Sequence, residues 1–161
     1  MLKGKTAVIT GASRGIGAAV AVKLAARGAD IAVIYAGNVE AANQVCKQCI
    51  EQYGVKAVAY KCNVADFSQV RETVAQIKKD FGTVHILINN AGITKDGLLA
   101  MMSEEAFDSV IDTNLKGAFN MIRHCTGMFI KNRQGCIVNV SSVSGLRSEE
   151  RRVGKECRSR W

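Results

Sequence analysis

The 161-residue sequence contains no proline, one tryptophan and two histidines, and aromatic residues make up only 6% of it. It has no apolar run long enough to span a membrane. The first residues, MLKGKTAVIT, lead directly into a strand pattern and lack a signal-peptide pattern. His85 and His124 fall in separate predicted elements and support no metal site. With 48% apolar residues the chain can form one domain with a proper core, which we expect in the cytoplasm.

Six scattered cysteines are best interpreted as reduced thiols in such a compartment. Cys46 and Cys49 form a C-x-x-C motif, which leaves a zinc or redox role as the alternative. The motif lies inside a helical pattern, with no second pair and no nearby histidine, and this favours the structural interpretation.

The net charge of +8 is unevenly distributed: residues 147–161 carry +3 and residues 1–146 carry +5. Scattered basic residues are more typical of a solvated surface than of a nucleic-acid stripe. Nucleic-acid binding through the basic C-terminal residues is the alternative.

A glycine-rich turn follows the first predicted strand, Ala7–Ile9. Gly11, Gly15 and Gly17 have the spacing G-x-x-x-G-x-G, which differs from the usual G-x-G-x-x-G dinucleotide fingerprint. A helix is predicted over residues 16–24, with Ile16, Val20 and Leu24 on one face. Strand, glycine loop and helix N-terminus together form a phosphate site. A plain strand–helix turn is the alternative.

Alternating strands and helices continue along the chain, with Asn38, Asp66 and Ser103 as helix N-caps. The predicted strands are residues 29–35, 56–62, 84–88 and 136–140, and the predicted helices are residues 39–52, 67–81 and 103–130, the last in two segments. This order predicts an α/β fold: a Rossmann-like, doubly wound parallel sheet that stops after its fifth strand. Polar residues follow several strands, so the ligand site is expected at their carboxyl ends.

Residues 147–161, RSEERRVGKECRSRW, show neither helical nor strand periodicity. A flexible basic tail is one interpretation. The segment also resembles the translation of a sequencing-adapter oligonucleotide, and we therefore predict a partial dinucleotide-binding domain over residues 1–146 and a non-native or disordered tail over residues 147–161.

The combination of TGASRGIG, NNAG and a serine pair after three successive strand ends resembles the classical short-chain dehydrogenase/reductase family over residues 2–146. The resemblance is greatest to bacterial members that reduce a 3-oxoacyl thioester of acyl carrier protein with NADPH in fatty acid synthesis. It implies a homotetramer and a set of cofactor-binding residues: Gly11, Ser13, Arg14, Ile16, Gly17, Asn63, Val64, Asn90, Ala91 and Gly92.

The resemblance also implies two catalytic residues. Asn114 matches the asparagine that bends its helix locally and holds a proton-relay water, and Ser142 matches the serine that hydrogen-bonds the substrate carbonyl. The family's tyrosine lies about thirteen residues after that serine, and its lysine four residues later. This chain has Lys155 and Ser159 there, so the Y-x-x-x-K element is absent and we expect this chain to be inactive.

Cofactor choice can be approached from the second strand. NAD sites usually place an acid at its end, whereas here Tyr35 is followed by Ala-Gly-Asn. Arg14 could pair with a 2′-phosphate, so NADP(H) is predicted. The resemblance implies acyl carrier protein as the partner, with Arg133 at a docking position; a solvated loop arginine is the alternative. A different short-chain reductase, acting on acetoacetyl-CoA or a secondary alcohol, and a non-catalytic dinucleotide-binding module remain the competing functions.

Overall fold

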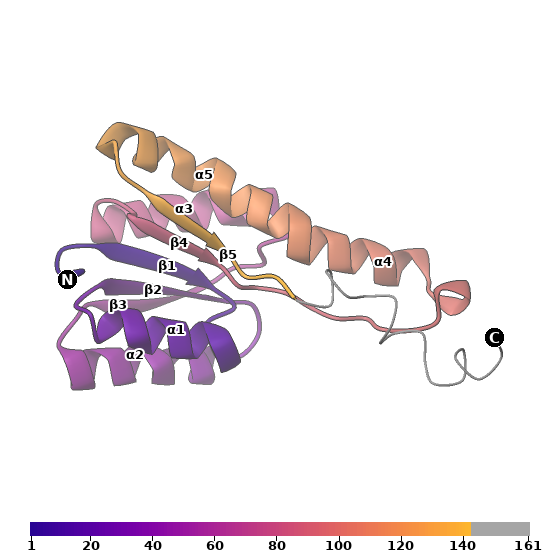
Figure 1. The fold of residues 1–161 in the computed structure, drawn as a ribbon, viewed down its shortest axis with the longest axis horizontal. Coiled ribbons are helices and arrows are strands. Elements are labelled where there is room, and N and C mark those ends of the chain that lie inside the picture. The colour runs from indigo at the N-terminus through magenta and orange to yellow at the C-terminus, as the bar shows by residue number, and fades with distance from the viewer. Residues whose placement is uncertain (143–161) are drawn as a thin grey trace.

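The computed structural model describes residues 1–142, so the predicted tail lies outside the described residues. Strands and helices alternate through the first two-thirds of the chain (Figure 1). The strands are β1 (Thr6–Thr10), β2 (Asp30–Tyr35), β3 (Ala57–Lys61), β4 (Ile86–Asn89) and β5 (Cys136–Asn139). The helices are α1 (Gly15–Ala25), α2 (Val39–Tyr53), α3 (Phe67–Phe81), η1 (Leu99–Met101), α4 (Glu104–Ile111), the π-helical η2 (Asp112–Lys116) and α5 (Gly117–Asn132).

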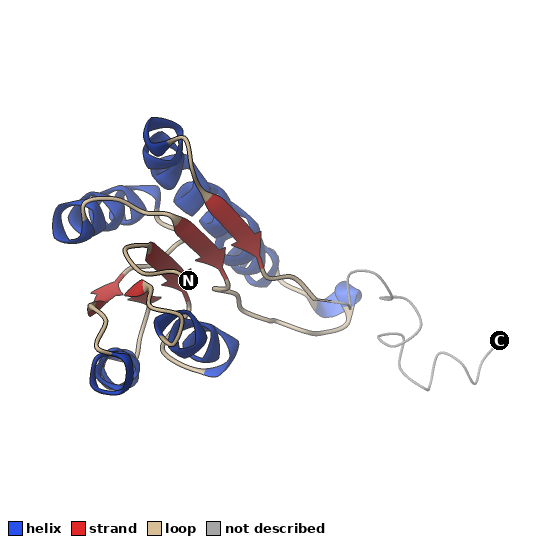
Figure 2. Ribbon diagram, turned by 60° about the vertical axis from the view of Figure 1, so that its left-hand side comes forward, coloured by secondary structure: helices blue, strands red, loops and turns tan. Residues whose placement is uncertain are grey.

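All strand pairs in the described sheet are parallel, in the order β3-β2-β1-β4-β5. Helices α1 and α2 cover one face, and α3 and α5 cover the other (Figure 2). The predicted doubly wound Rossmann-like sheet is therefore confirmed. Because the strands are parallel, their carboxyl ends meet at a single edge, with β1 at the centre.

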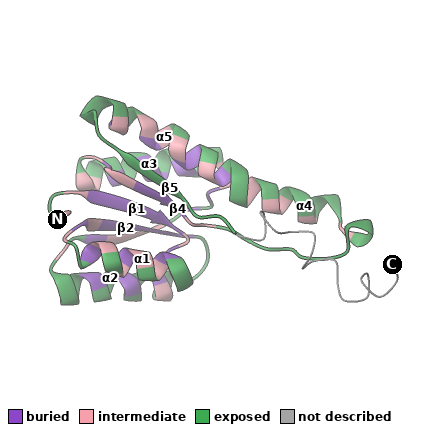
Figure 3. Ribbon diagram, in the orientation of Figure 1, coloured by how far each residue is buried: buried purple, intermediate pink, exposed green. Residues whose placement is uncertain are grey.

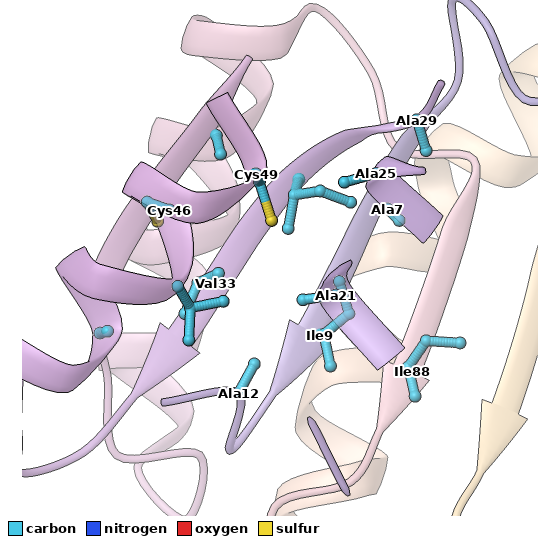
Figure 4. Packing of buried hydrophobic residues seen from close by; sticks show 14 of the residues in the cluster. Ala7, Ile9, Ala12, Ala21, Ala25, Ala29, Val33, Cys46, Cys49 and Ile88 are labelled. Atoms are coloured by element: carbon cyan, nitrogen blue, oxygen red, sulfur yellow. The ribbon is translucent and has the colours of Figure 1, made fainter. Parts of the chain in front are cut away.

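The predicted apolar face of α1 is displaced by one residue. Ile16 is 65% exposed, while the buried ridge consists of Gly17, Ala21 and Ala25. The small ridge lets the helix approach Ile9 and Val33 of the sheet closely (Figure 4). Larger side chains would hold α1 farther from the sheet, so close packing decides which face turns inward.

The described cysteines are free, and four of the five fill the two core layers. Cys46 and Cys49 lie on the inner face of α2 (Figure 4), and Cys125 lies on the inner face of α5. Burial raises the pKa of Cys46 to about 11, with a smaller contribution from Cys49, and raises that of Cys125 to about 12. These neutral thiols act as small apolar side chains.

The predicted helix caps are present. Asn38 accepts a hydrogen bond from the Ala41 N–H (2.8 Å), and Ser103 accepts one from Ala106 (3.2 Å). Asp66 accepts bonds from Ser68 and Gln69 at the start of α3. Backbone bonds from Gln69, followed by its side chain and the backbone of Ser68, lower the pKa of the Asp66 carboxyl. The N-terminus of a helix stabilises the charged carboxylate in the same sense.

The fifth strand forms one edge of the described sheet and pairs only with β4. Its residues are exposed, as Figure 3 shows, including Ile137, Val138 and the following Val140. Within the described residues β5 thus presents an unpaired, partly apolar strand edge. Within residues 1–142, no helix is both long and apolar enough to cross a membrane.

We predict that the folded chain loses stability as the pH falls, because of His85 and His124. Burial lowers the pKa of both rings, with smaller contributions from Lys5 at His85 and from Arg123 and Arg71 at His124. His85 Nδ1 also accepts the Thr6 N–H (3.0 Å), which requires an unprotonated nitrogen. The unfolded chain therefore binds more protons, and the free energy of unfolding should fall from about pH 7 through the lowered folded-state pKa values.

Urea denaturation between pH 7.5 and 5.5 measures this effect. The double variant His85→Gln, His124→Gln serves as the control and should show a flatter pH dependence. Equal slopes for the two proteins would refute the assignment to these histidines.

Candidate functional site

Two adjoining cavities open at the carboxyl edge of the sheet, where the polar strand ends were expected. The first has a volume of about 560 Å³ and the second about 360 Å³. Six residues, from the loops after β3 and β4 and from η2, line both cavities: Val64, Asn90, Ala91, Gly92, Ile93 and Thr113. The cavities therefore share a wall and can accept one elongated ligand.

The glycine loop forms one side of the first cavity. Gly11 and Gly15 adopt left-handed backbone conformations, with φ of 63° and 59°. A Cβ at Gly17 would lie 2.6 Å from the side-chain nitrogen of Asn90 and from the Gly11 carbonyl oxygen. The loop can therefore fold tightly above the start of α1, whose free N–H groups and positive dipole end suit a phosphate.

Thr10 and Asn90 join the glycine loop to the end of β4. The Thr10 hydroxyl accepts the N–H groups of Asn90 and Ala91, both at 2.9 Å. In return, Asn90 Nδ2 donates to the carbonyl oxygens of Thr10 (3.0 Å) and Gly11 (3.2 Å). This network fixes two loops that are about eighty residues apart in the sequence.

The other end of the first cavity lies beside β2 and β3. Its lining includes residues 34–38 and Cys62, Asn63 and Val64. Asn63 shapes its own turn by accepting the Ala65 N–H (3.1 Å). Burial raises the pKa of the Cys62 thiol, which is therefore neutral. The described lining contains Arg14 and no carboxylate.

The second cavity lies between the start of α5 and the ends of β4 and β5. Asn114, in the π-helical segment η2, accepts the Ile93 N–H (2.8 Å) and donates to the Ile93 carbonyl (3.0 Å). Ser141 and Ser142 line the opposite side. Asn89 donates to Asn139 Oδ1 (2.8 Å) and so ties β4 to β5 just before the serines.

The site residues predicted from the sequence line the two cavities, except Gly17; Arg133, predicted to bind a partner, lies elsewhere. The lining of the first cavity includes nine of them: Gly11, Ser13, Arg14, Ile16, Asn63, Val64, Asn90, Ala91 and Gly92. Gly17 packs beneath the loop and lines neither cavity, and Asn114 and Ser142 line the second. Arg133 caps α5 with a φ of 51°, immediately before β5 and hence at the opposite end of the sheet. Its predicted docking role stays a prediction.

Sequence reasoning missed Asn120, and it counted Thr10 and Asn89 among the polar strand ends without predicting their hydrogen bonds. Asn120, in α5, donates to the carbonyl oxygens of Val64 (2.8 Å) and Ala65 (3.3 Å). Thr10 and Asn89 each end a strand and thus carried a positional signal, whereas Asn120 lies inside a helix and carried none.

The family model for short chain dehydrogenases matches residues 5–153. The chain belongs to this short-chain dehydrogenase family. It is 47% identical to the 3-oxoacyl-[acyl-carrier-protein] reductase of Staphylococcus aureus, over 88% of this chain and 57% of that protein. It is 41% identical to the NADP-dependent mannitol dehydrogenase of Alternaria alternata, over 89% of this chain and 55% of that protein.

Among solved short-chain dehydrogenase structures, NAD⁺-bound xylitol dehydrogenase superposes with a TM-score of 0.86 at 33% identity. The alignment covers 91% of this chain and 56% of that structure. The chain thus spans little more than half the length of these short-chain dehydrogenase relatives.

Thr10→Val should destabilise the hydrogen-bond network that joins the glycine loop to the end of β4. Valine has a similar shape but accepts no hydrogen bond, so the N–H groups of Asn90 and Ala91 lose their acceptor. We expect a loss of about 2–4 kcal/mol in the free energy of unfolding, measured in urea. Thr126→Val is the matched control, because Thr126 bonds only to Ile122 of its own helix. Equal losses in the two variants would contradict the special role of Thr10.

Proposed function

We propose that this chain binds a nicotinamide dinucleotide, NADP(H), across its two adjoining cavities. The observation that carries the proposal is the continuity between the glycine loop at the α1 N-terminus and the cavity lined by Asn114 and Ser142. The pyrophosphate fits at the helix N-terminus, where Gly15 leaves open space. The adenosine half fits beside Asn63 and Val64.

Two features support a 2′-phosphate. The described lining of the first cavity lacks the carboxylate that would hold a free ribose 2′-hydroxyl. Arg14 is exposed at the mouth of the loop and lines that cavity. A guanidinium can bind phosphate oxygens through two parallel hydrogen bonds.

The reaction proposed for the whole protein is reduction of a 3-oxoacyl thioester of acyl carrier protein to the 3-hydroxyacyl thioester. The reduced nicotinamide supplies the hydride. Ser142 donates a hydrogen bond to the substrate carbonyl oxygen, where negative charge develops. Asn114 holds the loop at Ile93 in place and belongs to the proton path that the family resemblance implies. Similarity to a carrier-protein reductase supports this substrate.

Reduction of another carbonyl substrate, such as acetoacetyl-CoA or a ketone derived from a secondary alcohol, is the second candidate. The similarity to a mannitol dehydrogenase favours it. The described residues form only one side of a substrate cavity, at Ser141 and Ser142, and they carry no side chain that separates these substrates.

We propose that the 161-residue chain binds cofactor without efficient turnover, so that by itself it acts as a dinucleotide-binding module. The resemblance places the proton donor and its lysine at Lys155 and Ser159, and neither residue reproduces the tyrosine–lysine pair. Loss of a general acid commonly costs about two to four powers of ten in rate.

Self-association is proposed through α4, η2 and α5, with a homotetramer in the cytoplasm as the expected state of the whole protein. These three elements follow one another without a break and form one helical rod, residues 104–132. Exposed apolar side chains recur every four residues along it: Phe107, Ile111, Leu115 and Phe119. A stripe of this kind is typical of a subunit interface. Acyl carrier protein is acidic and would dock on a basic surface such as that at Arg133.

Cofactor binding is tested by titrating the purified 161-residue chain with NADPH and NADH and following the reduced-nicotinamide fluorescence. We expect tighter binding of NADPH. Arg14→Ala should weaken NADPH binding about tenfold or more and leave NADH binding nearly unchanged. Arg27→Ala, beyond the far end of α1, is the matched control. Tighter binding of NADH, or no effect of Arg14→Ala, would overturn the assignment of NADP(H).

Turnover is tested by the oxidation of NADPH in the presence of acetoacetyl thioesters of carrier protein and of CoA. The 161-residue chain should show a rate at least about a hundredfold below that of a protein with the complete tyrosine–lysine pair, assayed in parallel. A comparable rate would disprove the proposed lack of turnover. In the complete protein, a preference for the carrier-protein thioester supports the first candidate substrate and a preference for CoA the second.

A further inference from the structure

Val64 is one of the six described residues that line both cavities, and it is the one among them that comes from the loop after β3. It follows Asn63 in the loop after β3 and is only 6% exposed. From the α3 side the loop is braced locally: Gln69 Oε1 accepts the Asn63 N–H (3.1 Å), and the Asp66 N–H donates to the Asn63 carbonyl (3.0 Å). These bonds fix the turn itself but do not contact Val64.

Val64 packs in the core layer on this face of the sheet, and α5 gives it two further contacts. Asn120 is 1% exposed, and its Nδ2 donates to the Val64 carbonyl (2.8 Å) and to the Ala65 carbonyl (3.3 Å). One turn earlier, a Cβ at Gly117 would lie 2.6 Å from Val64 Cγ2. Residues 117 and 120 lie on the same face of the helix, so the amide holds the loop backbone while the glycine admits the valine side chain.

Burying the Asn120 amide at this position costs folding free energy. The Oδ1 atom of Asn120 is buried with no hydrogen-bond partner among residues 1–142. Burying an unpaired acceptor costs free energy, and a leucine of similar size would avoid that cost. The two bonds from the amide to the loop offset this cost. Asn120 therefore contributes by placing the loop and not by apolar packing.

We infer that Asn120 is a positioning residue of the dinucleotide site, which holds Val64 as the β3-side part of the wall that the two cavities share. This inference rests on the proposed dinucleotide binding. Because η2 and α5 form one continuous rod, Asn114 and Asn120 set the two sides of this wall relative to each other. Asn120 itself lines neither cavity and acts through Val64.

The first test compares NADPH and 2′,5′-ADP binding to the full 161-residue chain and to Asn120→Leu. Loss of the donor releases the Val64 and Ala65 carbonyls, so both ligands should bind about tenfold more weakly. Asn132→Leu is the matched control: it makes the same exchange in the same helix and loses a bond to Thr83, but at the far end of the sheet. It should bind both ligands like the unchanged chain.

A pH profile separates positioning from a general loss of stability. In Asn120→Asp, an ionised carboxylate would face two carbonyl oxygens, whereas the protonated acid could donate to one of them. Burial and these carbonyls raise the pKa of such a carboxyl. The NADPH affinity of Asn120→Asp should therefore recover from pH 8 toward pH 6, while that of Asn120→Leu stays low. Parallel profiles for the two variants would count against positioning by a donor.

Hydrogen exchange of the ligand-free chain tests the wall without relying on cofactor. Asn120→Leu should accelerate amide exchange in residues 64–66 and leave residues 90–93 unchanged. Gly117→Ala, whose Cβ would press on the Val64 side chain from the same face of α5, should weaken NADPH binding as well.

The outcomes distinguish the two proposals. Absence of NADPH binding by the unchanged chain would overturn the proposed function. Unchanged exchange in residues 64–66 of Asn120→Leu would overturn the positioning role, whatever the cofactor result.

Discussion

The close approach of the glycine loop to the end of β4 is the constraint on which the site depends. The Asn90 amide occupies the space that a side chain at residue 17 would need, at 2.6 Å from the ideal Cβ position. It can do so only because residue 17 is glycine, and it then donates to Thr10 and Gly11. The glycine loop and the loop after β4 are consequently tied together by hydrogen bonds, although they are distant in sequence.

A second constraint runs along the helical rod. The π-helical segment η2 adds a residue to the turn around Asn114. With this extra residue, the Asn114 amide bonds to both backbone groups of Ile93, while the next turns bring Gly117 and Asn120 against Val64. The rod therefore contacts the loops after β3 and β4 together, and those loops line both cavities.

Most of the fold could be predicted from the sequence because its signals are local. Asp66 and Gly82 bound α3 at the predicted residues, and alternating strands and helices implied the parallel sheet. The inward face of α1 could not be predicted from hydrophobicity. The helix packs so close to the sheet that small residues such as Ala21 and Ala25 fit between them, whereas Ile16 lines the first cavity.

Some features of the site could likewise be predicted from the sequence and others could not. Residues that line a cavity, such as Arg14 and Asn63, occur in local motifs and were predicted. The hydrogen bonds that hold the lining in place were not predicted, because the partners are remote: Asn120 bonds to a loop fifty-six residues away, and Thr10 bonds to one eighty residues away. No periodicity or motif encodes such a pair, and the tertiary structure was needed to find it.

The two halves of the site also differ in how firmly the sheet holds them. The glycine loop follows β1, which pairs with a strand on each side. Ser142 follows β5, which within residues 1–142 pairs with β4 alone; Ile137, Val138 and the following Val140 are exposed. The Asn89–Asn139 bond and the bond from the Val140 N–H to the Asn89 carbonyl (2.9 Å) align β5 with β4 at this end. Within residues 1–142, the strand that precedes Ser142 is therefore held by one strand pairing, whereas the glycine loop follows a strand at the centre of the sheet.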